Sequence, residues 1–383
     1  MKYLIKFYLI LIFFIIFCFN SFANDKVKIG LVVPLSGEDE ELGKSILKSV
    51  RLAINDINDD KIIIIPKDNQ NNPNKTLEVS KDLYSQGVKI IIGPVFKKNT
   101  LKLSQLSNDL IFLSFTNKID EPKKNIISAG VNSISQFNAI KKFQSLNGIE
   151  RSFLFAPKNE ILEEIKVGIK KSKIKLKDKF FYDSDPTLIT KQIEDITRYA
   201  IRKQNLLDEI LRVEKSDNPN KEKILENLKK KYTLGDLKFD SVIIADFDES
   251  LKSVVTSLLY TDVSPKEKYI ITLNQWFDES LLKEINTQPI YYPSINKNNY
   301  DNFILKFSEK FDYKPNHLSL LSYDLIGLIY YLSLTNSSEE ISKSFKSKNT
   351  FKGKMGIFEI KDNEINHRLN FYEINEGKIK KIF

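Results

Sequence analysis

Two apolar runs with a short helix between them most restrict the fold of this chain. The segment over residues 88–117 reads VKIIIGPVFKKNTLKLSQLSNDLIFLSFTN, in which 90–92 and 112–114 would be strands and 99–106 an amphipathic helix. Continuous apolar runs are typical of strands buried on both faces, and two such strands joined by a helix favour a parallel pair with a right-handed crossover. The segment therefore predicts part of a parallel α/β sheet.

The same segment indicates where a ligand would bind. Ligands bind such sheets beyond the carboxyl ends of the strands, which selects the loops at 93–99 and 114–117. Applied to the other predicted strands, the rule adds Ser36, Asn159 and Trp276, the last of which could be either a ligand platform or a core residue. The candidate ligand-binding residues are therefore Ser36, Phe96, Lys97, Ser114, Phe115, Thr116, Asn117, Asn159, Trp276 and, in the last long helix, Tyr323.

Strands and helices alternate along most of the chain. Apolar runs at 27–34 and 62–65 predict strands, and helical spacing at 42–57 and 75–86 predicts the helices that follow them. The alternation restarts after residue 131, where the predicted strands are 152–156, 241–245 and 269–273. This order predicts an α/β protein with two doubly wound lobes.

One long segment interrupts the alternation. Residues 187–232 lack strand signals, mix charges of both signs and place apolar residues at helical intervals, with a turn at 217–220. We interpret this segment as a helical-hairpin insert in the second lobe. It could be a solvent-exposed insert without a binding role, or an element that docks on a partner.

The first 23 residues are typical of an export signal. Two lysines are their only charges, residues 7–19 are almost wholly apolar, and Ser21-Phe22-Ala23 supplies the small residues that a signal peptidase reads. A membrane anchor is the alternative, but the apolar run is shorter than the about 20 residues of a spanning helix. Cys18 leaves lipidation open. We expect export to the periplasm with cleavage near Ala23, and membrane contact only through partners.

Charge and motif content favour binding without catalysis. The net charge is +9, but the 59 Lys and Arg residues are dispersed among 50 Asp and Glu residues, which does not indicate a nucleic-acid partner. The two histidines, His317 and His367, have no ligand at metal-binding spacing, and no nucleophile elbow or phosphate-binding glycine loop occurs. We therefore expect no catalytic residues, no metal and no cofactor.

Several segments together resemble the type I periplasmic-binding-protein family, whose best-known members bind leucine, isoleucine and valine. They are IGLVVPLSGEDEELG near the start, IIGPVFKKNT and FLSFTN in the middle, and KFDYKPNHLSLLSYDLIGLIYYL near the end. Within the family, LFAPKNE, ITLNQWFDESLL and the charged insert resemble the penicillin-binding-protein activators more than the dedicated amino-acid importers.

The resemblance implies two lobes joined by a three-crossover hinge, with a small polar ligand in the cleft between them. Lobe 1 would comprise residues 24–130 and 293–348, and lobe 2 residues 131–292 and 349–383. Three places depart from the amino-acid binders. Lys97 stands near the serine that would hold the ligand carboxylate, and Asn159 is not followed by the usual tyrosine. The loop after the second strand has the bulky Phe115 in place of a small residue and Lys118 where a threonine is expected. Lys97 could hold an anion or be a charge on the rim of the site.

Two functions follow from the resemblance. The first is a penicillin-binding-protein activator-like regulator of peptidoglycan assembly, which would bind a peptidoglycan synthase. The second is the substrate-binding receptor of an ABC importer, which would deliver an amino acid or a related solute to an ABC permease. Neither function is enzymatic.

Overall fold

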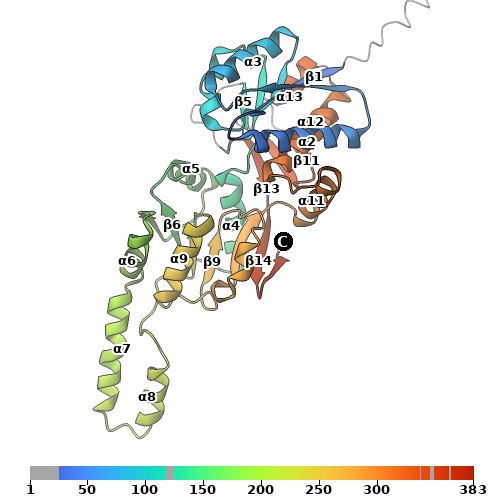
Figure 1. Ribbon diagram of the computed structural model, residues 1–383. Coiled ribbons are helices and arrows are strands. Elements are labelled where there is room, and N and C mark those ends of the chain that lie inside the picture. Colours follow the sequence, from blue (N-terminus) through green and yellow to red (C-terminus); the bar gives the residue numbers. More distant parts are fainter. Residues whose placement is uncertain (1–25, 118–124, 337, 346–348, 362–363) are drawn as a thin grey trace, which may run out of the picture. The chain divides into compact units, whose positions relative to one another are not determined.

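The computed structural model describes residues 26–117, 125–336, 338–345, 349–361 and 364–383, and it divides into two compact units (Figure 1). The first unit contains the chain up to Ser128 and then Leu318–Asn349, and the second contains Ala129–His317 and Thr350–Phe383. The expected signal peptide, residues 1–23, lies outside the described residues. Both units are α/β, as the alternation predicted.

The first unit is built on a parallel sheet with the strand order β5-β4-β3-β1-β2. The apolar runs form these strands because a parallel sheet covered by helices buries both faces of its central strands, and every residue of β3, β4 and β5 is buried. The strands are β1 (Val27–Val33), β2 (Ile62–Asp68), β3 (Ile90–Ile92), β4 (Ile111–Ser114) and β5 (Ile126–Ser128).

Among the described residues, the helices beside this sheet are α2 (Glu40–Ile57), α3 (Pro73–Ser85), α12 (His317–Ser333) and α13 (Ser338–Ser344). Helix α3 begins at Pro73 because the Asn72 side chain accepts hydrogen bonds from the next free backbone N–H groups. Helices α2 and α12 are joined by a hydrogen bond between the Ser45 and Ser319 hydroxyls, 2.8 Å apart.

The helix predicted over residues 99–106 is wrong. The chain instead forms two short 3-10 turns, η1 (Lys97–Thr100) and η2 (Leu103–Gln105). Of the three leucines on which the prediction depended, Leu103 is buried but Leu101 is 65% exposed, so they do not share one buried face.

The second unit contains a mixed sheet with the strand order β15-β14-β10-β9-β8-β6-β7. The five strands from β7 to β10 are parallel; β14 pairs antiparallel with β10, and β15 pairs antiparallel with β14 at the edge of the sheet. The strands are β6 (Ser152–Pro157), β7 (Asp178–Tyr182), β8 (Ser241–Ile244), β9 (Tyr269–Thr272), β10 (Ile290–Ser294), β14 (Asn370–Asn375) and β15 (Lys378–Lys381).

Helices and three further strands complete the second unit. The helices beside the sheet are α4 (Ser133–Leu146), α5 (Leu162–Ser172), α9 (Asp248–Tyr260), α10 (Ser280–Lys283) and α11 (Lys297–Phe311), with a 3-10 turn η3 (Ile285–Thr287). The further strands are β11 (Asn349–Lys352), β12 (Ile357–Lys361) and β13 (Glu364–Arg368), of which β12 and β13 pair antiparallel.

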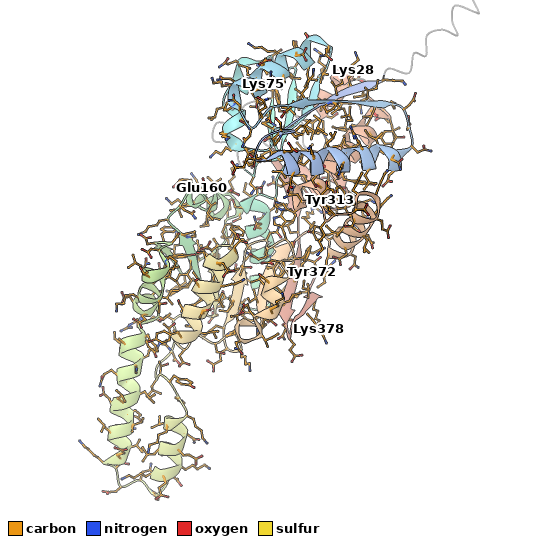
Figure 2. The ribbon with its side chains drawn as sticks, viewed as in Figure 1. Lys28, Lys75, Glu160, Tyr313, Tyr372 and Lys378 are labelled. Atoms are coloured by element: carbon orange, nitrogen blue, oxygen red, sulfur yellow. The ribbon has the colours of Figure 1, made fainter. Side chains whose placement is uncertain are left out.

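The structure places residues 293–317 in the second unit, whereas we expected them in the first lobe. The reason is that β10 pairs with β14 and the following helix stays beside it. Tyr372 of β14 (Figure 2) donates its hydroxyl to the Ile295 carbonyl and accepts from the Lys297 N–H, at 2.8 and 2.9 Å.

The expected helical insert contains a helix of the core fold and a separate hairpin. Helix α6 (Pro186–Thr197) packs on α9, where the Thr190 and Ser257 hydroxyls are 2.9 Å apart. Helices α7 (Tyr199–Glu214) and α8 (Lys221–Lys229) run side by side beyond the sheet of the second unit (Figure 1). They share a small core of their own, formed by Leu206, Val213 and Leu228.

The hairpin begins and ends at nearly the same place. Arg198, with a φ of 55°, separates α6 from α7 in the left-handed conformation. Where the chain returns from α8, the Leu234 N–H donates to the Arg202 carbonyl at 2.9 Å. In the described part of the chain, none of the helices is both long enough and apolar enough to cross a membrane.

Candidate functional site

The carboxyl edge of the first sheet gathers most of the candidate residues. Ser36 follows β1, Phe96 and Lys97 follow β3, and residues 114–117 end or follow β4. Because these strands are parallel neighbours, their following loops meet at one edge, as predicted.

The hydroxyl of Ser36 is already used within this edge. It donates to Asp68 Oδ2 at 2.5 Å, and the other carboxylate oxygen accepts from the backbone N–H groups of Leu35 and Gln70 at 2.8 and 2.9 Å. Partial burial disfavours the charged carboxylate, but these hydrogen bonds outweigh it and lower the pKa of Asp68. The ionised Asp68 therefore holds the loop after β1 in place.

The two hydroxyls after β4 are also used internally. Ser114 donates to the Pro94 carbonyl at 2.9 Å, which leaves Thr116 as the donor in the 3.1 Å contact between the Ser114 and Thr116 hydroxyls. Both side chains and that of Phe115 are buried. The loop is therefore a closed hydrogen-bonded turn, and neither hydroxyl proton is left to donate to a ligand.

Lys97 and Asn117 are exposed at this edge, and Phe96 is half-buried. Beside them Asn99 is fully buried, and its Nδ2 donates to Asn71 Oδ1 at 2.9 Å. Asn99 Oδ1 has no hydrogen-bond partner among the described residues, although buried polar atoms usually have one.

The carboxyl edge of the second sheet carries a strained loop after β9. Trp276 and Phe277 both have a positive φ, 47° and 61°, which is costly for aromatic residues and is often found at functional sites. Asn274 anchors the loop: its Oδ1 accepts from the Trp276 N–H at 3.0 Å and from the Ser294 hydroxyl at 2.8 Å. The buried Asn274 Nδ2 has no acceptor among the described residues.

His317 lies under the indole of Trp276. The two rings are stacked with their centroids 4.7 Å apart and an angle of 26° between their planes. Burial lowers the pKa of His317 to about 4, so the imidazole is neutral at pH 7. Trp276 itself is only partly buried, so the loop combines a supported aromatic surface with an unmet amide donor.

Two other candidate residues lie apart from these groups. Asn159 is exposed in the loop after β6, beside Glu160 (Figure 2), and its side chain accepts from the Ile161 N–H. The Tyr323 hydroxyl donates to Asp56 Oδ2 at 2.6 Å near the end of α2. Because α2 runs back from the carboxyl ends of the strands, Tyr323 lies toward the amino edge of the first sheet and is not brought together with the others.

Three polar residues of these edges, Asp68, Asn274 and His317, were not among the candidate site residues, whereas Asn99 ends the loop at 93–99 that was selected. Asp68 ends β2, so the carboxyl-end rule could have found it. Nothing in the sequence indicates the unmet amide groups or the stacking of His317 on Trp276. Among the described residues, no three His, Cys, Asp or Glu side chains converge as a metal site would require.

Comparison with known proteins identifies the fold. Residues 26–172 match the sequence model of a family described as periplasmic binding protein. No curated protein matches the chain in sequence. The solved structures that are similar over 93% of the chain include the LpoA C-domain from Haemophilus influenzae, described as a regulator of PBP1A, an ABC transporter substrate-binding protein and a leucine-binding protein.

The LpoA C-domain is matched over 100% of its length, with a TM-score of 0.63 and 13% identity. An ABC transporter substrate-binding protein from Desulfitobacterium hafniense in complex with Leu is also matched over 100%, with a TM-score of 0.60 and 12% identity. The leucine-binding protein LivK from Thermotoga maritima is matched over 98%, with a TM-score of 0.56 and 13% identity.

The chain has the type I periplasmic-binding-protein fold. The expected resemblance and fold class are thereby confirmed. Solved structures with this fold include both an ABC transporter substrate-binding protein and a regulator of PBP1A.

Proposed function

We propose that this chain is a non-catalytic periplasmic regulator of peptidoglycan assembly that docks on a peptidoglycan synthase through the α7–α8 hairpin. It would be exported and cleaved near Ala23. The observation that carries the proposal is a pair of exposed leucines on α7, Leu207 and Leu211, which are 48% and 52% exposed.

The two leucines are not needed for the hairpin's own core. They are four positions apart and so share one face of α7, whereas the core of the hairpin uses Leu206 and Val213. Ile201 on the same helix and Tyr232 after α8 are also exposed. Large apolar side chains gathered on a projecting element are typical of a protein-docking surface.

The first-unit site supports a regulator over an amino-acid receptor. A receptor needs hydroxyl and N–H donors directed at the ligand carboxylate, but Ser36 donates to Asp68, and Ser114 and Thr116 donate within their own turn. The likeness to the LpoA C-domain agrees with this choice.

Replacing both leucines with glutamate, Leu207→Glu with Leu211→Glu, tests the docking surface. We expect binding of a purified peptidoglycan synthase from the same cell to weaken at least tenfold, because two apolar contacts would be replaced by charges that stay hydrated. The measurement is co-purification followed by a binding isotherm. The fold should be unaffected, because both side chains already face solvent.

Leu305→Glu is the matched control, because Leu305 is 62% exposed on α11 of the same unit but outside the hairpin. It should leave binding unchanged. Equal binding by the hairpin variant and the wild type would rule out this surface. These point variants are preferable to deleting residues 187–232, since that deletion removes α6, whose Ile189 and Ile193 are buried in the unit.

The substrate-binding receptor of an ABC importer is the second candidate, and the Trp276 loop favours it. A ligand carbonyl or carboxylate oxygen would satisfy the buried Asn274 Nδ2, while the Trp276 ring would pack on the apolar part of an amino acid. Such a receptor would deliver its ligand to an ABC permease.

Thermal unfolding with a panel of amino acids and muropeptides separates the two candidates. A ligand present at one hundred times its Kd increases the free energy of unfolding of its receptor by about 2.7 kcal/mol, which raises Tm measurably. Trp276→Asn should abolish the shift, since asparagine tolerates the left-handed backbone but lacks the ring. An increase in Tm with an amino acid favours the receptor. An increase in Tm with muropeptides alone favours the regulator. The regulator is also favoured if no compound raises Tm but the chain binds the synthase.

A further inference from the structure

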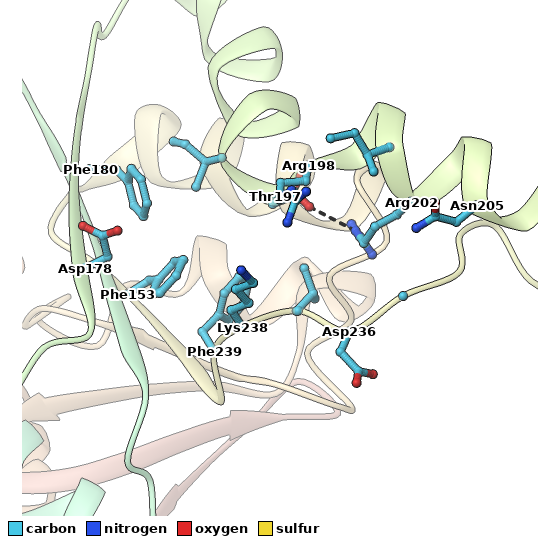
Figure 3. A pocket seen from close by; sticks show the side chains of 14 residues that line it. Phe153, Asp178, Phe180, Thr197, Arg198, Arg202, Asn205, Asp236, Lys238 and Phe239 are labelled. Atoms are coloured by element: carbon cyan, nitrogen blue, oxygen red, sulfur yellow. Dashed lines mark hydrogen bonds between the residues drawn. The ribbon is translucent and has the colours of Figure 1, made fainter.

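A cavity of about 370 Å³ lies at the base of the α7–α8 hairpin (Figure 3). Its walls come from β6 and β7, from the junction of α6 and α7, and from residues 235–239, which lead into β8. Phe153 and Asp178 are near the starts of their strands, so the cavity is at the amino edge of the second sheet. The loops with Asn159 and Trp276 are at the opposite edge, and the cavity is therefore separate from the candidate site.

One side of the cavity is aromatic. Phe153 packs on Phe180 and Phe239, with ring centroids 5.2 and 4.8 Å apart. In Figure 3 these rings lie on the strand side, while Arg202 reaches in from the helix side. Ile196, Ile201 and Leu237 add apolar surface. Such a wall favours a ligand with a flat apolar group, because aromatic rings gain from stacking and edge contacts beyond the area they bury.

The other side presents a buried cation. Arg202 is only 5% exposed, and its guanidinium donates to the Thr197 carbonyl at 3.0 Å, to the Thr233 hydroxyl at 2.9 Å and to the Thr261 carbonyl. These acceptors use three of its five N–H groups. No carboxylate pairs directly with it in the described part of the chain; Asp262 is reached only through Thr233.

A buried cation is costly unless an anion compensates it, and Arg202 has only the more distant Asp262 carboxylate, which attracts it across Thr233. The exposed Arg198 and Lys238 also line the cavity, and the exposed Asp178 and Asp236 oppose them, so the lining carries a net charge of +1. That balance suits a singly charged anion better than a doubly charged phosphate.

We propose that this cavity binds a small carboxylate that carries an aromatic ring, with the ring on the phenylalanine wall and the carboxylate at Arg202 and Arg198. The bound molecule would contact both the sheet and the α6–α7 junction, and would therefore tie the hairpin to the body of the unit. The proposal is independent of the synthase and of the amino-acid site.

The test is calorimetric titration of the mature chain, from Asn24 onward, with 3-phenylpropionate and 4-phenylbutyrate. We expect saturable binding with a Kd below about 1 mM for at least one of them. The uncharged amide of the same acid should bind at least tenfold more weakly, because it cannot compensate Arg202. Trp276→Asn should leave the affinity unchanged, since that loop is at the other edge of the sheet.

Arg202→Met keeps the aliphatic stem and removes the charge, and should weaken binding at least tenfold. If this variant does not fold, the double variant Arg198→Gly with Lys238→Gln tests the charge requirement instead. Glycine is chosen because it readily adopts the left-handed backbone conformation of Arg198. Arg212→Gln, on the same helix but outside the cavity, is the matched control. The proposal is overturned by absence of saturable binding to either acid, by equal binding of the amide, or by unchanged affinity in the charge variant that folds.

Discussion

Gly43→Ala is expected to destabilise the first unit by about 3 kcal/mol or more. A Cβ atom on Gly43 would lie 1.6 Å from the Pro34 carbonyl oxygen, far inside any permitted contact. The clash is with backbone rather than with a flexible side chain, and the segment cannot shift freely because Leu35 and Ser36 are both hydrogen-bonded to Asp68. Alanine at residue 43 would therefore distort α2 and the loop after β1 together.

The chain offers a matched control for this substitution. Gly327 is also inside a helix, α12 of the same unit, but nothing lies within 4 Å of a Cβ placed on it. Gly327→Ala should be neutral or stabilise by up to about 1 kcal/mol, because alanine is the better helix former. Urea unfolding followed by far-UV circular dichroism measures both variants. Equal midpoints would show that Gly43 is not tightly packed.

Acidification from pH 6.5 toward pH 4 should destabilise the second unit through its two histidines. Burial lowers the pKa of His367 to about 4, and the same holds for His317. An unfolded histidine has a pKa near 6.5, so in this window the unfolded chain binds a proton that the folded chain does not. Each histidine then costs at most about 1.4 kcal/mol per pH unit as the pH falls, and nothing above pH 7.

Trp276 provides the measurement, because it is the chain's only tryptophan and lies in the second unit. The urea concentration at the unfolding midpoint, measured by its fluorescence, should decrease as the pH is lowered from 7 to 5. Most carboxylates do not titrate in this range. His367→Gln should be less stable at pH 7, since the ring's hydrogen bond to the Ala129 carbonyl is lost, but should have a flatter pH dependence. An unchanged slope in the double variant with His317→Gln would contradict the assignment.

Much of the fold could be predicted because its central strands are continuous apolar runs. Runs such as those of β1 and β3 have few alternatives, since both faces of each strand are buried. The edge strand β7 was not predicted, because DKFFY starts with two exposed charged residues and lacks the apolar pattern of the others. Strand β13, which reads EINHR, was also not predicted, because its polar residues do not form an apolar run.

The sequence could predict where most of the candidate residues lie in the sheet, but not which hydrogen bonds their side chains make. The carboxyl-end rule depends only on strand order, so it located Ser36, Lys97 and Ser114 at one edge. Whether a hydroxyl is available depends on neighbours far away in sequence: Asp68 accepts the hydrogen bond of the Ser36 hydroxyl, and the Pro94 carbonyl accepts that of Ser114. Tyr323 shows the same limit, because only the packing of α12 on α2 places its hydroxyl on Asp56.

The two ends of the α7–α8 hairpin meet at the hydrogen bond between Leu234 and Arg202, and the hairpin has its own small core. A segment whose ends are already adjacent can be lengthened, shortened or exchanged at little cost in loop closure, and without disturbing the strands beside it. Exchange of this hairpin would therefore change the binding surface of the chain without requiring a new arrangement of the sheet. A chimera that carries another hairpin between residues 202 and 234 should keep both sheets intact.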